Sequence, residues 1–164
     1  MNSRRTVTRL LNLSLPLLLA AGCATGGPRF SQPESPSRPD EALVYFYRPG
    51  KEAWNVKGRK FHLYANSQEV GTLPFGGYFH RTLAPGRTVF LADSSGSLFL
   101  SGALVYAVEE VSKKPGVVSV ELAPGSVTFV KLQAKDEFWS IGGHLLIEER
   151  EAALKGLEKT KLVQ

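Results

Sequence analysis

The sequence predicts an all-β domain, and its composition supports this in two ways. Val and Thr are frequent, and nine Phe, five Tyr and two Trp add further residues that favour strands. Sixteen Gly and ten Pro imply frequent turns. The 164 residues, of which 43% are hydrophobic, suit one domain with appendages, so we expect one modest core.

The first 22 residues have the pattern of a secretory signal. Arg4, Arg5 and Arg9 come before an apolar stretch from Leu10 to Ala21 that ends in small residues. This stretch has about 12 residues, whereas a membrane-spanning helix needs about 20. We therefore expect residues 1–22 to be a signal peptide rather than a permanent transmembrane anchor.

The sequence Leu-Ala-Ala-Gly-Cys at residues 19–23 resembles the bacterial lipobox, although Ala20 stands where Leu is more frequent. The resemblance implies that Cys23 carries diacylglycerol and becomes the new N-terminus. Acyl chains bind membranes firmly because each buried methylene contributes about 0.8 kcal/mol. Ala24, in place of Asp, implies sorting to the outer membrane of a two-membrane bacterium. The alternative is an ordinary signal peptide with an incidental cysteine nearby.

Residues 23–41 form a segment with prolines at positions 28, 33, 36 and 39. Such a segment buries too little apolar surface to offset its ordering entropy. We expect a Pro-rich, disordered tether that holds the folded part away from the bilayer.

The first strand is predicted at residues 43–47, Leu-Val-Tyr-Phe-Tyr, before the turn residues Arg48-Pro49-Gly50. The lack of polar alternation predicts burial on both faces. Residues 61–65 and 70–73 then predict a hairpin, in which Asn66 suits a positive φ in the turn.

Two later stretches, residues 83–90 and 122–129, both place Leu-Ala-Pro-Gly between runs of strand-forming residues. Pro fixes φ at the first turn position and Gly permits a positive φ at the next, so we predict a hairpin at each. In the strand that enters the second turn, Val118 and Val120 alternate with Ser119, which predicts one buried and one exposed face.

The C-terminal part predicts a last strand at residues 144–147 and a short amphipathic helix within 148–161, packed on the sandwich edge. Residues 97–111 fit either strands or a short helix. In total, about seven short strands linked by turns predict an antiparallel β-sandwich over residues 42–148, immunoglobulin-like or transthyretin-like, with a C-terminal helix and tail at 149–164. A small barrel is the alternative.

Several motifs follow one another in a characteristic order, namely Ala-Leu-Val-Tyr-Phe-Tyr-Arg-Pro at 42–49, Val-Gly-Thr-Leu at 70–73, Gly-Tyr-Phe at 77–79, Leu-Ala-Pro-Gly at 83–86 and Glu148-Glu149 before a helix. From about residue 42 to 160 the chain resembles a family of bacterial lipoproteins catalogued as domain of unknown function 2846. The resemblance implies a β-sandwich related to surface-exposed bacterial modules and brings no catalytic residues. The chain departs from the family by a longer, more apolar connection between Asp93 and Gly116, which is a candidate site.

The charge of the chain does not favour a nucleic-acid partner. The formal net charge is +5, but without the three arginines of the signal the chain has 17 basic and 15 acidic residues. These basic residues are scattered along the sequence, whereas polyanion binding needs a clustered basic face. We therefore expect no nucleic-acid partner.

The sequence contains no convincing catalytic or metal-binding pattern. His62, His80 and His144 are the only histidines, and they lack the close spacing of a preformed zinc motif. Cys23 is the only cysteine, which excludes an intramolecular disulfide and a Cys-based metal site. Residues 93–97, Asp-Ser-Ser-Gly-Ser, are the nearest approach to a serine-hydrolase elbow and fit a turn better. We predict no enzyme, no cofactor and no metal.

Trp54 and Trp139 are the candidate contacts with a ligand or partner, because an indole ring can stack on a glycan or anchor a protein interface. The alternative is that they close the ends of the sandwich. The leading hypothesis is a non-enzymatic interaction or structural module of the cell envelope, lipid-anchored at Cys23. A glycan- or small-ligand-binding lipoprotein is the second hypothesis, and an envelope hydrolase using His80 or His144 is the third.

Overall fold

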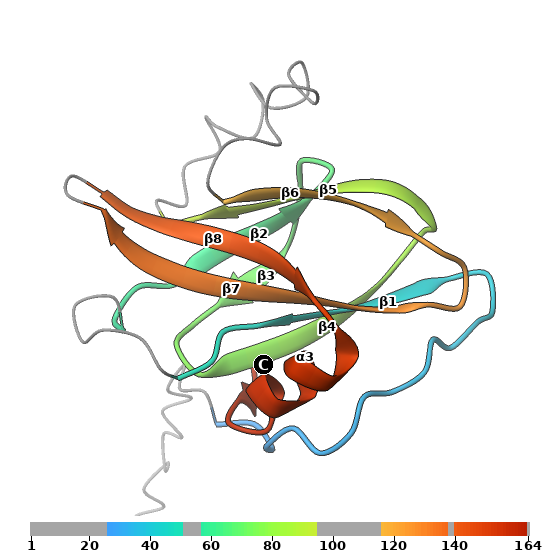
Figure 1. Cartoon of the computed structure of the whole chain (residues 1–164), viewed down its shortest axis with the longest axis horizontal. Helices are drawn as coiled ribbons and strands as arrows, with labels where there is room; N and C mark the ends of the chain where they lie inside the picture. The colour runs from blue at the N-terminus through green and yellow to red at the C-terminus, as the bar shows by residue number, and fades with distance from the viewer. Residues whose placement is uncertain (1–25, 51–56, 95–115, 138–139, 164) are drawn as a thin grey trace, which may run out of the picture.

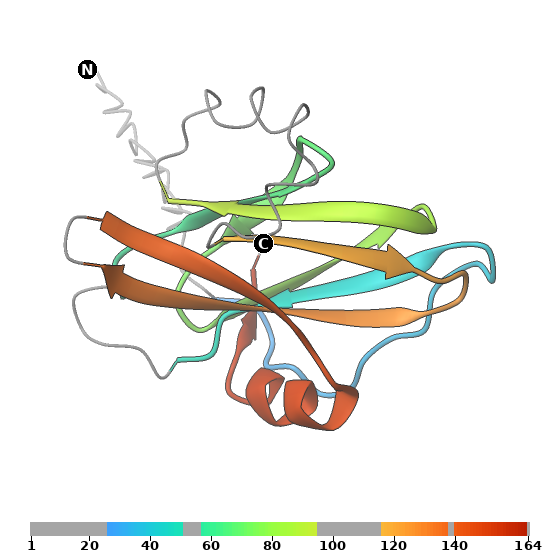
Figure 2. The ribbon, with the colours of Figure 1, turned by 45° about the horizontal axis from the view of Figure 1, so that its top comes forward.

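The computed structural model describes residues 26–50, 57–94, 116–137 and 140–163. These residues form two β-sheets that pack face to face (Figure 1), and Figure 2 shows the two layers from a second direction. The described part contains nine strands and one short helix, so the predicted all-β sandwich is confirmed. Two more strands are present than the seven that the sequence predicts.

The first sheet has five strands with the short strand β1 at its centre. Its order is β8 (Ser140–Glu148), β7 (Val127–Glu137), β1 (Ala42–Tyr47), β4 (Gly77–Leu83) and β9 (Lys161–Leu162). β1 is antiparallel to β4 and parallel to β7. β9 pairs in parallel with β4 and so forms one edge of the sheet.

The second sheet has four strands and is antiparallel throughout. Its order is β3 (Gln68–Leu73), β2 (Phe61–Ala65), β5 (Gly86–Asp93) and β6 (Val117–Leu122). β2 and β3 form the predicted hairpin, and Asn66 adopts the expected positive φ of 48° in its turn.

The main core lies between the two sheets. Phe46 of β1 stands at its centre, with its ring centroid 5.1 Å from those of both Phe79 and Phe90. Leu122 is buried there, and Val118 and Val120 pack against the same cluster, as their alternation predicts. This contact joins strands of both sheets and accounts for the sandwich.

A second apolar cluster covers the outer face of the first sheet. Leu43, Tyr45 and Tyr47 of β1 point to this face, opposite to Val44 and Phe46. Every residue of β1 is therefore buried, which confirms the predicted burial on both faces.

The helix α3 (Arg150–Leu157) supplies part of this second cluster through its buried residues Ala153 and Leu157. It is shorter than the predicted range because Glu148 still belongs to β8 and Lys161 already belongs to β9. It also lies on the outer face of the sheet rather than at the sandwich edge (Figure 1), because Tyr47 and Phe129 offer an apolar surface there.

The two Leu-Ala-Pro-Gly stretches are not hairpins, which corrects the sequence prediction. β4 and β5 belong to different sheets, and so do β6 and β7. Each turn is thus an arch that carries the chain across the core from one sheet to the other. The physical reason is that Leu83 and Leu122, which lead into the arches, pack in the core between the sheets. The turn residues reverse the chain direction, but core packing decides whether the flanking strands pair.

Part of the segment predicted as a disordered tether packs on the folded domain, and we call residues 27–41 the strap. Phe30 is buried with 8% exposure, and its backbone N–H donates to the Thr160 carbonyl at 3.3 Å. The Leu162 N–H donates to the Pro28 carbonyl at 2.9 Å. One aromatic side chain and backbone pairing to β9 thus oppose the ordering entropy on which the prediction of a disordered tether depends. Residues 23–25 lie outside the described part.

Candidate functional site

Three of the sequence-predicted site residues lie outside the described part of the chain, namely Cys23, Trp54 and Trp139. The same is true of residues 95–115, which make up most of the connection between Asp93 and Gly116. In the part of the chain that the structure describes, no helix has the length and apolar character needed to cross a membrane.

The strand directions define two ends of the sandwich. At one end, which we call the Phe75 end, β3 stops at Leu73 and β4 begins at Gly77. At the other, which we call the arch end, Pro85 and Pro124 stand in the two arches. The strap starts at the Phe75 end, where β9 pairs with Gly77, and reaches the arch end, where the Gly125 N–H donates to the Glu41 carbonyl at 2.7 Å. Figure 1 shows the strap in blue along the outer side of the sheet.

The described residues that flank the two tryptophans belong to the same end. β1 runs toward Gly50 and β2 starts at Phe61, while β7 ends at Glu137 and β8 starts at Ser140. All four positions lie at the Phe75 end of their strands, given the pairing of the sheets.

The side chain of Arg48 contacts several of these segments, although the sequence predicts only a turn residue at this position. Its side chain is fully buried, and its guanidinium carbon lies 5.0 Å from the Phe61 ring centroid and 5.7 Å from that of Phe75. It also donates a hydrogen bond to the Arg59 carbonyl. Arg48 therefore joins the end of β1 to the start of β2 and to the turn before β4.

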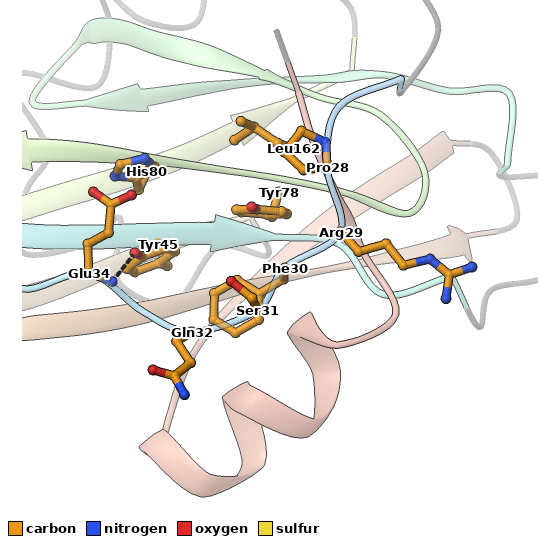
Figure 3. Close-up of a pocket in the computed structure, with 10 residues that line it drawn as sticks. All are labelled: Pro28, Arg29, Phe30, Ser31, Gln32, Glu34, Tyr45, Tyr78, His80 and Leu162. Carbon is orange, nitrogen blue, oxygen red and sulfur yellow. Dashed lines mark hydrogen bonds between the residues drawn. The ribbon is translucent and has the colours of Figure 1, made fainter.

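A cavity of about 220 Å³ lies between the strap and the first sheet (Figure 3). Tyr45, Tyr78 and His80 line it from the sheet, and Phe30 and Glu34 line it from the strap. Cavities that bind small molecules usually measure about 300–1,000 Å³. The volume is therefore small for a dedicated ligand site.

The aromatic rings that line this cavity pack against one another. Phe30 meets Tyr45 and Tyr78 edge to face at centroid distances of 5.9 and 5.4 Å. His80 stacks on Tyr45 at 5.2 Å, and the side chain of Glu34 extends toward His80 in Figure 3. The phenol oxygen of Tyr45 accepts a hydrogen bond from the Glu34 N–H at 2.7 Å. This contact fixes the middle of the strap.

Burial raises the pKa of both Tyr45 and Tyr78, and the nearby charge of Glu34 raises each further. The backbone hydrogen bond from Glu34 acts in the opposite direction on the pKa of Tyr45 and is outweighed. Both phenols therefore stay neutral at physiological pH and can donate hydrogen bonds.

The three histidines are not brought together. His62 lies in the second sheet and forms a 2.8 Å contact with Glu69. His80 on β4 and His144 on β8 lie three strands apart in the first sheet, roughly 14 Å at the usual strand spacing. Among the residues that the structure describes, no cluster of three His, Cys, Asp or Glu side chains could hold a metal ion.

Sequence reasoning missed the residues that build the cavity. The sequence predicts only strand residues at Tyr45 and Tyr78 and a disordered segment around Phe30. Two signals could have identified Phe30. It is the single large aromatic residue of a Pro-rich segment, and the strand that follows this segment is apolar on both faces.

Comparisons with known proteins do not assign the chain. No family model matches it, and no curated protein matches it either. The resemblance to domain of unknown function 2846 therefore stays a prediction, and function must be argued from the residues themselves.

Proposed function

We propose that the mature chain is a bacterial cell-envelope lipoprotein, anchored in the outer membrane through Cys23, whose β-sandwich is a non-enzymatic interaction or structural module. One observation carries the proposal: the lipobox-like residues 19–23 end four positions before Gly27, where the strap packs against Leu162. Removal of residues 1–22 would thus leave the described fold complete, with Cys23 at its start.

The satisfied interior supports a module rather than a ligand carrier. In the described part of the chain, no buried side-chain nitrogen or oxygen lacks a hydrogen-bond partner. A dedicated ligand site usually presents convergent polar groups in a cavity larger than the one under the strap. These features favour a role for the outer surface.

Fatty-acid labelling tests the anchor directly. The full-length chain and a Cys23→Ala variant are expressed in a two-membrane bacterium that is fed an alkyne-tagged fatty acid. We expect label only on the wild-type chain, and the variant should remain a precursor or become soluble. A Ser31→Ala variant is the matched control because Ser31 is exposed. Processed, membrane-bound Cys23→Ala protein would show that the anchor is not at Cys23.

An Ala24→Asp variant tests the membrane assignment. Outer-membrane sorting is expected for the wild-type chain, and retention in the inner membrane is expected for the variant. Separation of the two membranes by density, followed by detection of the labelled protein, gives the result. Equal distribution of both chains would contradict the proposed outer-membrane location.

The second candidate function is binding of an envelope glycan through Trp54 and Trp139. It is favoured by the finding that the described residues flanking both tryptophans lie at the Phe75 end. This candidate is tested by titrating the intrinsic fluorescence of the protein with peptidoglycan fragments and with lipopolysaccharide. The variants Trp54→Phe and Trp139→Phe show which of the two tryptophans gives a change in fluorescence. A flat response to all of these ligands would remove this candidate.

A further inference from the structure

The ordered strap restricts how far the folded domain can move from Cys23. Only three residues separate Cys23 from Gly27, whose backbone packs so tightly on Leu162 that a Cβ there would lie 2.4 Å from the Leu162 carbonyl oxygen. Four extended residues span at most about 14 Å. The strap thus begins close to whatever surface holds Cys23.

The sheet register places the start of the strap relative to the arches. Gly27 packs on Leu162 of β9, which is level with Lys131 of β7. The arches lie at least four residues further along β7, beyond Val127, which is roughly 13 Å at the usual strand rise. The Phe75 end, where the strap begins, is therefore the end nearer to an anchored Cys23.

Basic side chains gather at the Phe75 end. Lys161 pairs with Gly77 and also forms a backbone bridge with Arg29, and the Lys161 N–H donates to the Gly76 carbonyl at 2.9 Å. Lys57 places its ammonium 5.4 Å from the centroid of the Phe75 ring. These contacts connect residues that are far apart in the sequence.

Arg59 and Lys60 complete this group, since the Arg59 carbonyl accepts the hydrogen bond from Arg48 beside Phe75. We call the five residues the basic rim, and all five are exposed: Arg29, Lys57, Arg59, Lys60 and Lys161. Within the described residues, none of the five forms an ion pair. Phe75, partly exposed, lies among them.

The arch end differs in its charges. Arg38 and Glu41 lie 3.6 Å apart there, and Arg87 stands opposite Glu121 across the β5–β6 pair. Charges of both signs thus alternate at the arch end, whereas the basic rim carries one sign. The acidic residues Asp136 and Glu137 belong to the same end as the rim but lie further along β7, beyond Lys131. Glu158 and Lys159, which follow α3, are adjacent and offset each other.

We infer that the Phe75 end is a membrane-docking surface, on which the basic rim binds the headgroups of anionic phospholipids and Phe75 enters the interfacial layer. The inference rests on the proposed lipid anchor, because the short link is what directs this end to the bilayer. Clustered lysines and arginines are attracted to anionic leaflets, and aromatic rings favour the headgroup region. The domain therefore stands with its arches away from the membrane.

The orientation can be measured on the mature chain (residues 23–164) without relying on cellular lipidation. Since Cys23 is the only cysteine, it can be coupled to maleimide lipids in vesicles of phosphatidylcholine and phosphatidylglycerol in equal amounts. The variant Phe75→Trp is made in a Trp54→Phe/Trp139→Phe background, so that position 75 carries the only tryptophan. Quenching of its fluorescence by brominated lipids then reports how deeply position 75 enters the bilayer. Glu121→Trp, exposed near the arch end, is the matched control. We expect strong quenching at position 75 and little at 121, and equal quenching would overturn the inference.

A second measurement keeps Phe75 intact, in case its substitution disturbs the fold. The mature chain with Cys23→Ala is sedimented with the same vesicles at low salt. We expect Lys57→Gln and Lys161→Gln each to weaken partition about fivefold, and Arg87→Gln to leave it unchanged. Equal partition of all four chains, or no partition of the parent chain, would overturn the inference. Fatty-acid labelling in cells tests the lipid anchor separately, so the two failures are distinguishable.

Discussion

The phenol of Tyr47 donates a hydrogen bond to the carboxylate of Glu148, which joins the centre of the first sheet to the last residue of β8. The other carboxylate oxygen of Glu148 accepts a hydrogen bond from the Lys131 ammonium at 2.6 Å. The three side chains come from three neighbouring strands, and Tyr47 packs against the helix α3. They link the sheet to the start of the helix that covers it.

Stability should fall in acid because of Glu148. Burial alone would raise the pKa of Glu148, but the hydrogen bonds from Lys131 and Tyr47 and the charge of Lys131 outweigh it and lower the pKa below the ordinary 4.5. A carboxyl whose folded pKa is depressed stabilises the fold above its unfolded pKa, and this contribution is lost as pH falls through the folded pKa. Urea unfolding at pH values from about 6 to 3 measures it.

The control for this pH dependence is Glu148→Gln, which keeps the shape of the side chain and cannot ionise. At neutral pH we expect it to lower the free energy of unfolding by about 1–2 kcal/mol. Its stability should then decline less than that of the wild type between pH 6 and 3, roughly the range in which carboxyl groups titrate. If the free energy of unfolding falls equally with pH in both chains, Glu148 is not the cause of the loss of stability in acid.

Phe30→Ala tests whether the strap is part of the fold. The substitution removes a buried ring that contacts Tyr45 and Tyr78, so we expect a loss of about 2–3 kcal/mol in the free energy of unfolding. Ser31→Ala, on the exposed side of the strap, should change it by less than about 0.5 kcal/mol. Chemical denaturation of the mature chain gives both values, and an unchanged midpoint for Phe30→Ala would mean that the strap is a free tether.

Gly156→Ala should destabilise the protein although alanine is the better helix former. A Cβ at this position would lie 2.6 Å from the Cε2 atom of Tyr47, so α3 must move away from the sheet. Helix propensity alone would favour the variant by about 1 kcal/mol. We expect the clash to outweigh this gain in thermal unfolding. In a Tyr47→Ala background, Gly156→Ala should instead raise the thermal stability. If it still lowers the stability there, the contact with Tyr47 does not decide the effect.

The arch glycines should resist substitution. Gly125 has φ +68° and Gly86 has φ +119°, which are conformations that residues with a Cβ rarely adopt. Gly125→Ala and Gly86→Ala are each expected to cost about 1–3 kcal/mol. Gly58→Ala is the matched control, since its added Cβ meets nothing within 4 Å and its φ is not strained. A cost at Gly58 equal to that at the arches would refute strain as the cause.

The strands were predictable where the local pattern decides the structure. The apolar run at residues 43–47 predicts a central strand, and Asn66 marks a hairpin because its side chain tolerates a positive φ. The arches were not predictable in this way. Leu83 and Leu122 face the space between two sheets, and that arrangement depends on residues distant in the sequence.

The candidate sites were harder to predict than the fold. The cavity under the strap depends on the docking of Phe30 onto Tyr45 and Tyr78, which the high proline content of the segment concealed. The basic rim was missed because Arg29, Lys57 and Lys161 are scattered along the sequence. They come to one end because Lys161 pairs with Gly77, Arg29 bridges to Lys161, and Lys57 lies over the Phe75 ring.

The parallel pairing of β1 with β7 also determines when the first sheet can form. Leu43 pairs with Val127, so the central strand meets this neighbour only after most of the chain has been made. Contacts between residues so distant in sequence slow folding, because loop closure comes before any gain in stability. The β2–β3 hairpin can form early and β1 can pair with β4, whereas the other edge of β1 stays unpaired until β7 has been made. This late closure of the central strand is compatible with the proposed export, in which the chain passes a translocation pore before it folds.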